Sequence, residues 1–331
     1  MTLIEQLKER IFLPLSFQEF DEIALSLFEE QYYKVPPYKT YCDLLGKTPE
    51  KIEGVGQIPF LPIGFFKTHK ILHQNALAEE KFLSSGTTGT TPSVHYVPDL
   101  KFYERCFKQA FTRIYGPVEQ YVVLALLPSY LERTGSSLVY MANALIQASG
   151  HPSSGFYLDQ LQDLRALMHK LSAAGQRILL LGVSYALLDL AQLGPWELPQ
   201  STIIMETGGM KGKRAEWTKA ALHQELSKKF GLTQIHSEYG ITELMSQAYA
   251  TKEGKFITPP WMRVLTRDPE DPMTLIQERT GGINIIDLAN VYSCAFIATQ
   301  DLGKTQGDGH FSLLGRFDHS DIRGCNLLLE A

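Results

Sequence analysis

The chain has 331 residues, of which 44% are hydrophobic and 20% charged, a balance typical of a folded globular protein and not of a disordered one. The net charge of −5 argues against general nucleic-acid binding, which usually needs a basic surface. No run of about 18 apolar residues predicts a membrane-spanning helix, and the charged N-terminus does not resemble a signal peptide. We therefore expect a cytoplasmic protein of about two domains without a membrane span.

The first 35 residues predict helix, because apolar residues recur near helical spacing and Ser16 forms a capping-box pattern with Glu19. The pair Pro36-Pro37 is expected to end this helix. Prolines and aromatic residues are frequent over Tyr38–Ile71, which predicts an irregular segment packed on the core.

The middle of the chain alternates between two patterns. Continuous apolar runs of strand length occur at 121–127, 178–183 and 202–205. Helical patterns occupy the stretch after Asp99, which can act as an N-cap, and residues 136–149, 159–174, 184–193 and 214–230. Apolar strands that alternate with helices indicate an α/β fold, with a mostly parallel sheet covered by helices on both faces.

After about Pro259 the pattern changes to short β-like runs at 263–266, 283–286 and 294–298. We therefore predict an α/β core with N-terminal helices over residues 1–258. A smaller β-rich subdomain is predicted over residues 259–331.

The cysteines are Cys42, Cys106, Cys294 and Cys325, and their wide spacing argues against a disulfide framework or a zinc site. The nine histidines likewise lack metal-binding spacing. We interpret the first three cysteines as core residues and return to the fourth below.

A stretch made only of Ser, Thr and Gly covers Ser84–Thr91. Glycines let the backbone approach a ligand closely, and the hydroxyl and amide groups supply hydrogen-bond donors to a phosphate. The stretch is not a Walker P-loop, because the Gly-Lys-Ser/Thr ending is absent. A plain solvated turn is the alternative interpretation.

The second motif is Tyr239-Gly240-Ile241-Thr242-Glu243. A carboxylate after such a turn can hold Mg²⁺, which prefers oxygen ligands and often bridges a carboxylate to a phosphate. The alternative is the start of a helix, with Thr242 as its N-cap and Glu243 in the first turn.

Two further stretches contain Asp301 and Arg316, in Thr299–Gly303 and Gly315–Gly324. An Asp in a turn can accept hydrogen bonds from both hydroxyls of a ribose, and an Arg behind it can reach ribose or phosphate. Each pattern is weak by itself, because Asp-Gly turns and surface arginines are common.

The order of these four stretches resembles the adenylate-forming superfamily, which contains acyl-CoA synthetases, peptide-synthetase adenylation domains and firefly luciferase. Within it the sequence is most similar to the acyl-protein synthetases, the long-chain fatty acid–luciferin-component ligases, over Leu127–Met141, His236–Ala248 and Gly315–Asn326. The resemblance implies ATP- and Mg²⁺-dependent activation of a carboxylic acid, and of a fatty acid in particular, to an acyl-adenylate. The acyl group would then pass to a thiol, and an acyl-acceptor or reductase protein is a possible partner.

The resemblance also implies site residues. The triphosphate would be bound by Ser84, Ser85, Gly86, Thr87, Thr88, Gly89 and Thr90. Adenine would be sandwiched between two segments, which comprise Thr207, Gly208 and Gly209 and, on the other side, Glu238, Tyr239 and Gly240.

Catalytic and substrate roles follow from the same resemblance. Thr242 would contact the α-phosphate, Glu243 would bind Mg²⁺, Asp301 would bind the ribose, and Arg316 would bind ribose or the α-phosphate. Ser129, Tyr130 and His236 would line the acid pocket, although His95 and His236 can also be read as polar residues with local partners. Cys325 would accept the acyl group, unless it is a small buried hydrophobe.

The sequence departs from the superfamily pattern in two places. The loop reads Pro92-Ser93 where most relatives have Pro-Lys, and the chain ends at Ala331, too soon for a C-terminal lid with its catalytic lysine. Lys211 and Lys213 are candidates for the missing positive charge. Three hypotheses stay open: an acyl-protein synthetase, a CoA or carrier-protein ligase whose lid is supplied in trans, and a catalytically silent nucleotide-binding module.

Overall fold

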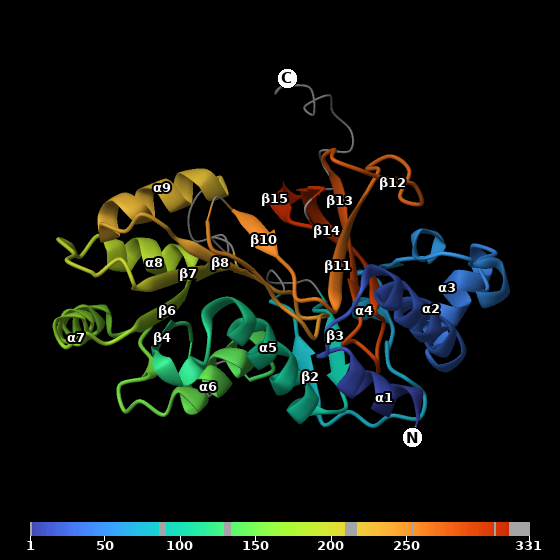
Figure 1. The fold of residues 1–331 in the computed structure, drawn as a ribbon, viewed down its shortest axis with the longest axis horizontal. Helices are drawn as coiled ribbons and strands as arrows, with labels where there is room; N and C mark the ends of the chain where they lie inside the picture. Colours follow the sequence, from blue (N-terminus) through green and yellow to red (C-terminus); the bar gives the residue numbers. More distant parts are fainter. Residues whose placement is uncertain are drawn as a thin grey trace.

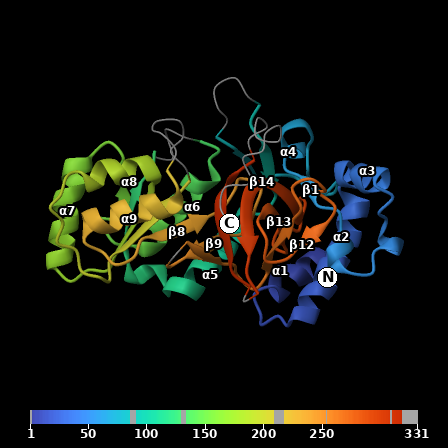
Figure 2. The same cartoon turned by 90° about the horizontal axis from the view of Figure 1, so that it is seen from above.

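One mixed β-sheet joins most of the strands, and helices cover its faces (Figure 1, Figure 2). The structure is a computed structural model that describes residues 2–85, 91–128, 134–208, 217–252, 254–307 and 309–317. Along the sheet the strands follow the order β12-β11-β13-β14-β15-β10-β9-β8-β7-β6-β4-β5, and β1 pairs with β14 beside this path. A separate hairpin consists of β2 (Glu80–Leu83) and β3 (Val94–Val97).

The half of the sheet from β5 to β8 is parallel. Every residue of β4, β6 and β7 is buried, as expected for strands that are covered on both faces. Helices α5 and α6 lie on one side of these strands, and α8 and α9 lie on the other (Figure 1). The strand bounds here are β4 (Val122–Leu126), β5 (Gly155–Phe156), β6 (Ile178–Val183), β7 (Ile203–Thr207) and β8 (His236–Tyr239).

The other half is antiparallel apart from β1, which runs parallel to β14. The change from helix-flanked strands to β-rich structure follows the sequence prediction, while the proposed division at residue 258 stays a prediction. These strands are β1 (Leu61–Pro62), β9 (Ala248–Ala250), β10 (Lys255–Ile257), β11 (Met262–Arg267), β12 (Leu275–Ile276), β13 (Gly281–Asp287), β14 (Phe296–Thr305) and β15 (Phe311–Arg316).

The N-terminal helices pack beside the antiparallel strands (Figure 2). The ring of Tyr38 stacks on Phe296 of β14 with centroids 6.2 Å apart, and Phe28 meets the same ring edge-on. The buried amide of Gln31 donates to the Asn290 carbonyl at 2.8 Å and accepts from the Ala295 amide at 2.9 Å. Aromatic packing and a buried polar contact together fix these helices on the sheet.

The helix predicted over the first 35 residues is two helices, because Pro14 interrupts the pattern and Ser16 caps a new start through its hydrogen bond from Glu19. A further helix begins at Pro36, a favourable first helical residue, and continues into the region from Tyr38 onward that was predicted to be irregular. The helices are α1 (Leu3–Arg10), α2 (Phe17–Lys34), α3 (Pro36–Leu44), α4 (Phe65–Thr68), α5 (Leu100–Tyr115), α6 (Ser137–Ser149), α7 (Leu161–Ala173), α8 (Ser184–Ala191) and α9 (Lys219–Phe230).

Several local predictions in the middle of the chain are confirmed. The Asp99 carboxylate caps α5 by accepting from the Phe102 amide at 2.8 Å, and Gly231 ends α9 with a positive φ of 68°. Short 3-10 turns occur at Pro49–Lys51, Val55–Gln57 and Val118–Gln120. Within the described ranges, the helices are too short or too polar to cross a bilayer.

The tight packing of β6 against its neighbours gives a stability prediction. A β-carbon added at Gly182 would lie 2.9 Å from both the Leu126 β-carbon and the Leu187 side chain. We expect Gly182→Ala to lower the free energy of unfolding by about 1–3 kcal/mol through overpacking. Gly54→Ala is the matched control, because its β-carbon would meet no described atom within 4 Å. Urea denaturation curves that are equal for the two variants would contradict this packing.

Candidate nucleotide-binding site

The turn that follows β8 carries the Thr-Glu pair of the second motif. It is not the start of a helix, as one interpretation of the sequence had it: Thr242 and Glu243 lie in a single turn closed by the Leu244 amide and the Ile241 carbonyl at 3.1 Å. Distant side chains bind the carbonyl groups of this turn. The His95 ring bonds the Thr242 carbonyl at 2.9 Å, and the Asn290 amide donates to the Glu243 carbonyl at 2.8 Å.

His95 is buried on β3, and burial lowers the pKa of its imidazole to about 4. The ring is therefore neutral at pH 7. Its Nδ1 atom faces a carbonyl oxygen, so Nδ1 must carry the proton and donate. His95 thus has a local structural partner, as the alternative interpretation of the sequence expected.

Asp287, at the end of β13, fixes the next residues of the same segment. Its carboxylate accepts from the Met245 amide at 2.9 Å, the Ser246 amide at 3.0 Å and the Ser246 hydroxyl at 2.7 Å. Burial raises the pKa of Asp287 to about 6, although these donors oppose that rise. The sequence analysis missed this residue; an acidic side chain that directly follows a buried apolar strand was the available signal.

The base of the Ser/Thr/Gly loop lies against Glu243. The Ser84 amide donates to the Ser93 carbonyl at 3.0 Å, and the Ser93 amide donates to the Ser84 hydroxyl at 2.8 Å. Ser93 also hydrogen-bonds the Glu243 carboxylate. Ser93, which stands where the superfamily pattern has a lysine, therefore contacts Glu243, the predicted metal-binding residue.

Burial raises the pKa of Glu243, and the Ser93 hydrogen bond and the Arg316 charge oppose this rise. The Asp301 carboxylate raises the same pKa. Such charge effects act over short distances. They therefore indicate that the residues predicted to bind the metal, the ribose and the phosphate lie near one another. The structure thus brings together Glu243, Asp301 and Arg316, which are far apart in the sequence.

Tyr239, Asp301 and Arg316 form a contiguous group on β8, β14 and β15. The Tyr239 hydroxyl donates to Asp301 Oδ2 at 2.7 Å, and Arg316 Nε lies 3.3 Å from Asp301 Oδ1. Asp301 and Arg316 are direct partners in the strand register. The Arg316 side chain is 68% exposed, so its guanidinium is accessible to a ligand beside the nearly buried carboxylate.

A buried arginine lies behind this group. Arg267 donates to the Ile283 carbonyl at 2.7 Å, to Asn284 Oδ1 at 2.8 Å and to the Thr299 carbonyl at 2.5 Å. Burial lowers the pKa of Arg267 to about 10, and the Asp301 charge opposes that change. Burial also raises the pKa of Asp301, while Tyr239 and the two arginines oppose that rise.

The predicted adenine residues come from the adjacent ends of β7 and β8. Thr207 is the register partner of Glu238, and its hydroxyl donates to the Glu238 carboxylate. The Gly208 carbonyl accepts from the Ser184 hydroxyl at 3.0 Å. A β-carbon at Gly240 would lie 2.6 Å from Glu238 Oε1, so only glycine fits there without displacing the carboxylate. The carboxyl edge of parallel strands is where ligands bind in open α/β sheets.

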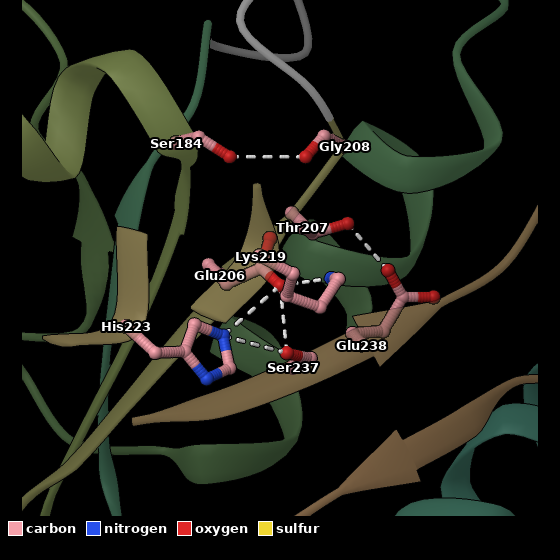
Figure 3. A network of polar contacts seen from close by, with 8 residues as sticks. All are labelled: Ser184, Glu206, Thr207, Gly208, Lys219, His223, Ser237 and Glu238. Atoms are coloured by element: carbon pink, nitrogen blue, oxygen red, sulfur yellow. Dashed lines mark hydrogen bonds and ion pairs between the residues drawn. The ribbon is translucent and has the colours of Figure 1, made fainter. Parts of the chain in front are cut away.

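Neighbouring residues on β7 and β8 point to the opposite face and form a second polar network (Figure 3). There Glu206 accepts from the Ser237 hydroxyl at 2.6 Å and contacts Lys219 and His223 of α9. Burial alone would raise the pKa of Glu206, but its bonds to His223 and Lys219 hold it below the usual value. The network connects α9 to the strands that carry Thr207 and Glu238.

His236 lies at the amino end of β8, away from the turn, and its Nδ1 atom is 3.2 Å from the Tyr115 hydroxyl. Burial lowers the pKa of His236 to about 4. Its predicted substrate contact stays a prediction. Several predicted site residues, unlike His236, lie outside the described residues. They are Gly86, Thr87, Thr88, Gly89, Thr90, Ser129, Tyr130, Gly209, Lys211, Lys213 and Cys325.

The described residues contain no cluster of three or more His, Cys, Asp or Glu side chains that would hold a metal ion by themselves. A single carboxylate such as Glu243 nevertheless fits Mg²⁺ that arrives with a nucleotide, because this ion commonly uses one protein carboxylate together with phosphate oxygens. The raised pKa of the buried Glu243 carboxyl also fits, because a cation beside it would compensate its charge.

Comparison with solved structures identifies the fold. The structure matches 2-hydroxyisobutyryl-CoA ligase in complex with 2-HIB-AMP and CoA, with a TM-score of 0.65 at 14% identity, over 92% of this chain and 76% of that one. It matches ATP-bound MatB from Rhodopseudomonas palustris with a TM-score of 0.52 at 17% identity, over 71% and 47%. The match to MatB thus spans about half the length of that protein. No family model and no curated protein matches the sequence. The predicted α/β fold is confirmed, and it is shared with these two structures.

The burial of Glu238 gives a pH-dependent prediction for stability. Burial raises the pKa of its carboxyl from 4.5 to about 7. The stabilisation from the bound proton is therefore complete below pH 4.5 and is lost as the pH rises through 7. We expect Glu238→Gln, which needs no proton, to gain roughly 3 kcal/mol of unfolding free energy relative to the wild type between pH 5 and pH 8.

Urea denaturation at the two pH values measures this difference. Glu29→Gln, at an exposed position of α2, is the control and should follow the wild type at both. A Glu238→Gln curve parallel to that of the wild type would show that the buried carboxyl is ionised throughout this range.

Proposed function

We propose that the protein activates a carboxylic acid with ATP, forming an acyl-adenylate and releasing pyrophosphate, and then transfers the acyl group to a thiol. The arrangement of Tyr239, Asp301, Arg316 and Glu243 is the observation that carries this proposal. A hydrogen-bonded carboxylate with an accessible guanidinium beside it, both exerting charge effects on the buried Glu243 carboxylate, supports such a site. The fold likeness to structures with bound ATP and with an acyl-adenylate analogue of this kind supports it.

In this reaction the acid carboxylate attacks the α-phosphorus of ATP, and the bond to pyrophosphate breaks. Asp301 would bind the ribose hydroxyls, since its Oδ2 is oriented by the Tyr239 hydroxyl. The exposed guanidinium of Arg316 would stabilise negative charge at the α-phosphate or bind the ribose, and the Thr242 hydroxyl would contact the same phosphate. The loop from Ser84 to Thr90 would bind the β- and γ-phosphates.

Mg²⁺, held by the Glu243 carboxylate, would supply charge neutralisation for the phosphates. The chain contributes the position of that carboxylate. Ser93 binds it, and Asn290 fixes the main chain at the same residue. Burial excludes water from the carboxylate, which strengthens any electrostatic contact made there.

The acyl acceptor is a thiol outside the described core. Cys42, Cys106 and Cys294 are buried, and burial raises the pKa of each thiol, to about 12 for Cys42. These thiols stay protonated at neutral pH and are poor nucleophiles. The acceptor is therefore Cys325, as the sequence resemblance implies, or a thiol on a partner.

A CoA or carrier-protein ligase, with its lid supplied in trans, is the second candidate. The fold similarity to a CoA ligase structure favours it. Cys325→Ser distinguishes the two: labelled acyl transfer onto the protein should vanish in the variant if the chain acylates itself. Undiminished thioester formation with CoA would instead support the ligase.

Acid-dependent ATP–pyrophosphate exchange tests activation itself, since it needs no acceptor. We expect exchange with at least one carboxylic acid, and a loss of roughly 100-fold or more in Glu243→Gln, because a metal-binding carboxylate stabilises transition-state charge. Glu53→Gln, at an exposed position, is the control and should keep wild-type exchange.

Two results would contradict this proposal. Wild-type exchange in Glu243→Gln would remove Glu243 from the site. No exchange with any acid, in a protein that still binds ATP, would identify a nucleotide-binding module without catalysis, the remaining hypothesis from the sequence.

A further inference from the structure

A row of polar side chains lies on the sheet face beneath α5, and two of its residues, Thr207 and Glu238, belong to the segments predicted to contact adenine. Thr207 pairs with Glu238, and Glu238 pairs with Tyr249, across β7, β8 and β9. Direct register partners project to the same face of a sheet. The ring of Tyr115, from α5, lies 5.4 Å from that of Tyr249, so α5 covers this row.

The Tyr249 hydroxyl has no hydrogen-bond partner among the described residues, although the side chain is only 2% exposed. Buried polar groups nearly always have a partner, because an unpaired one loses its bonds to water without replacement. Burial, together with the nearby Glu238 carboxylate, raises the pKa of Tyr249 well above its usual value. The hydroxyl therefore keeps its proton and can both donate and accept.

Among the described residues, Thr207 is the one hydrogen-bond donor found for the Glu238 carboxylate. Its Oε2 atom accepts from Thr207, whereas Oε1 points toward Gly240. Gly240 and Gly208 are exposed at the ends of β8 and β7, and neither carries a side chain that covers this oxygen. A ligand at the edge of the sheet can therefore reach Oε1 past the two glycines.

No cation on this face compensates Glu238 within the described part of the chain. The cation that most affects its carboxyl, Lys219, forms an ion pair with Glu206 on the opposite face (Figure 3). Thr207 already donates to Oε2, so a further donor, to Oε1, would come from outside the described residues.

We propose that Glu238 and Tyr249 form a subsite for a hydrogen-bond donor group, a hydroxyl or an amino group, on the acid substrate. The inference rests on the proposed function and specifies its substrate class. Such a group would donate to Glu238 Oε1 and contact the Tyr249 hydroxyl, so both buried groups gain a partner. An unsubstituted alkyl chain, as in a simple fatty acid, leaves both unpaired, and sites built for hydrogen bonds discriminate strongly against such analogues.

Exchange assays with matched acids test the subsite. The pairs are hexanoate with its ω-hydroxy and ω-amino derivatives, and benzoate with its para-hydroxy and para-amino derivatives. We expect the wild type to prefer a substituted acid by about tenfold or more in rate at low acid concentration, the value of one net hydrogen bond. Tyr249→Phe should reduce this ratio severalfold, and Tyr33→Phe, an exposed tyrosine of α2, should keep it.

Tyr249→Phe removes an oxygen without a described partner, so the variant should fold, and its melting temperature checks this directly. Equal rates for substituted and unsubstituted acids would overturn the subsite while leaving acid activation intact. Absence of exchange with every acid would count against the proposed function instead. In that case, binding of the acid tests the subsite. A substituted acid should raise the melting temperature of the wild type more than that of Tyr249→Phe. Equal shifts for the two proteins would overturn the subsite.

Discussion

The candidate site depends on how one short turn is held between β8 and β9. Buried backbone carbonyl groups need hydrogen-bond donors, and at Thr242 and Glu243 these donors are the side chains of His95 and Asn290. The Asp287 carboxylate in turn accepts hydrogen bonds from the amides of Met245 and Ser246, which follow in the chain. The turn thus connects the β2–β3 hairpin, the parallel strands and the antiparallel strands, and it fixes Glu243 where all three meet.

Patterns that depend on local sequence were predictable. The strands β4 and β6 are apolar at every position, because both of their faces are covered, and their bounds follow from this run. Helix caps such as Asp99 act within one turn and were equally visible. The four motifs indicated the fold, and three of their residues, Glu243, Asp301 and Arg316, do lie together.

The residues that hold the turn, His95, Asn290 and Asp287, were not predictable, because they contact residues that are far away in the sequence. His95 and Thr242 are 147 positions apart, and no local pattern distinguishes such a histidine from any other. The same reason explains the wrong interpretation of Thr242 as a helix N-cap: a Thr-Glu pair fits both structures, and the distant donors decide between them. The resemblance assigned Glu238 to adenine, and its side-chain direction became apparent only from the strand register.

Two buried carboxylates on successive strands, Glu206 and Glu238, differ in their hydrogen-bond partners. Glu206 has a lysine, a histidine and a serine as partners, and its network joins α9 to the sheet. Among the described residues, Glu238, on the other face, has one threonine as its hydrogen-bond partner, and its Oε1 faces Gly240. Full pairing is characteristic of a structural role, while incomplete pairing near an exposed edge is characteristic of a site that awaits a ligand.

A crystal structure with Mg²⁺ and a non-hydrolysable ATP analogue tests the central claim most directly. The account predicts ribose hydroxyls within hydrogen-bond distance of the Asp301 carboxylate and the metal ion next to Glu243. A nucleotide bound at another edge of the sheet, with Asp301, Arg316 and Glu243 all untouched, would contradict it.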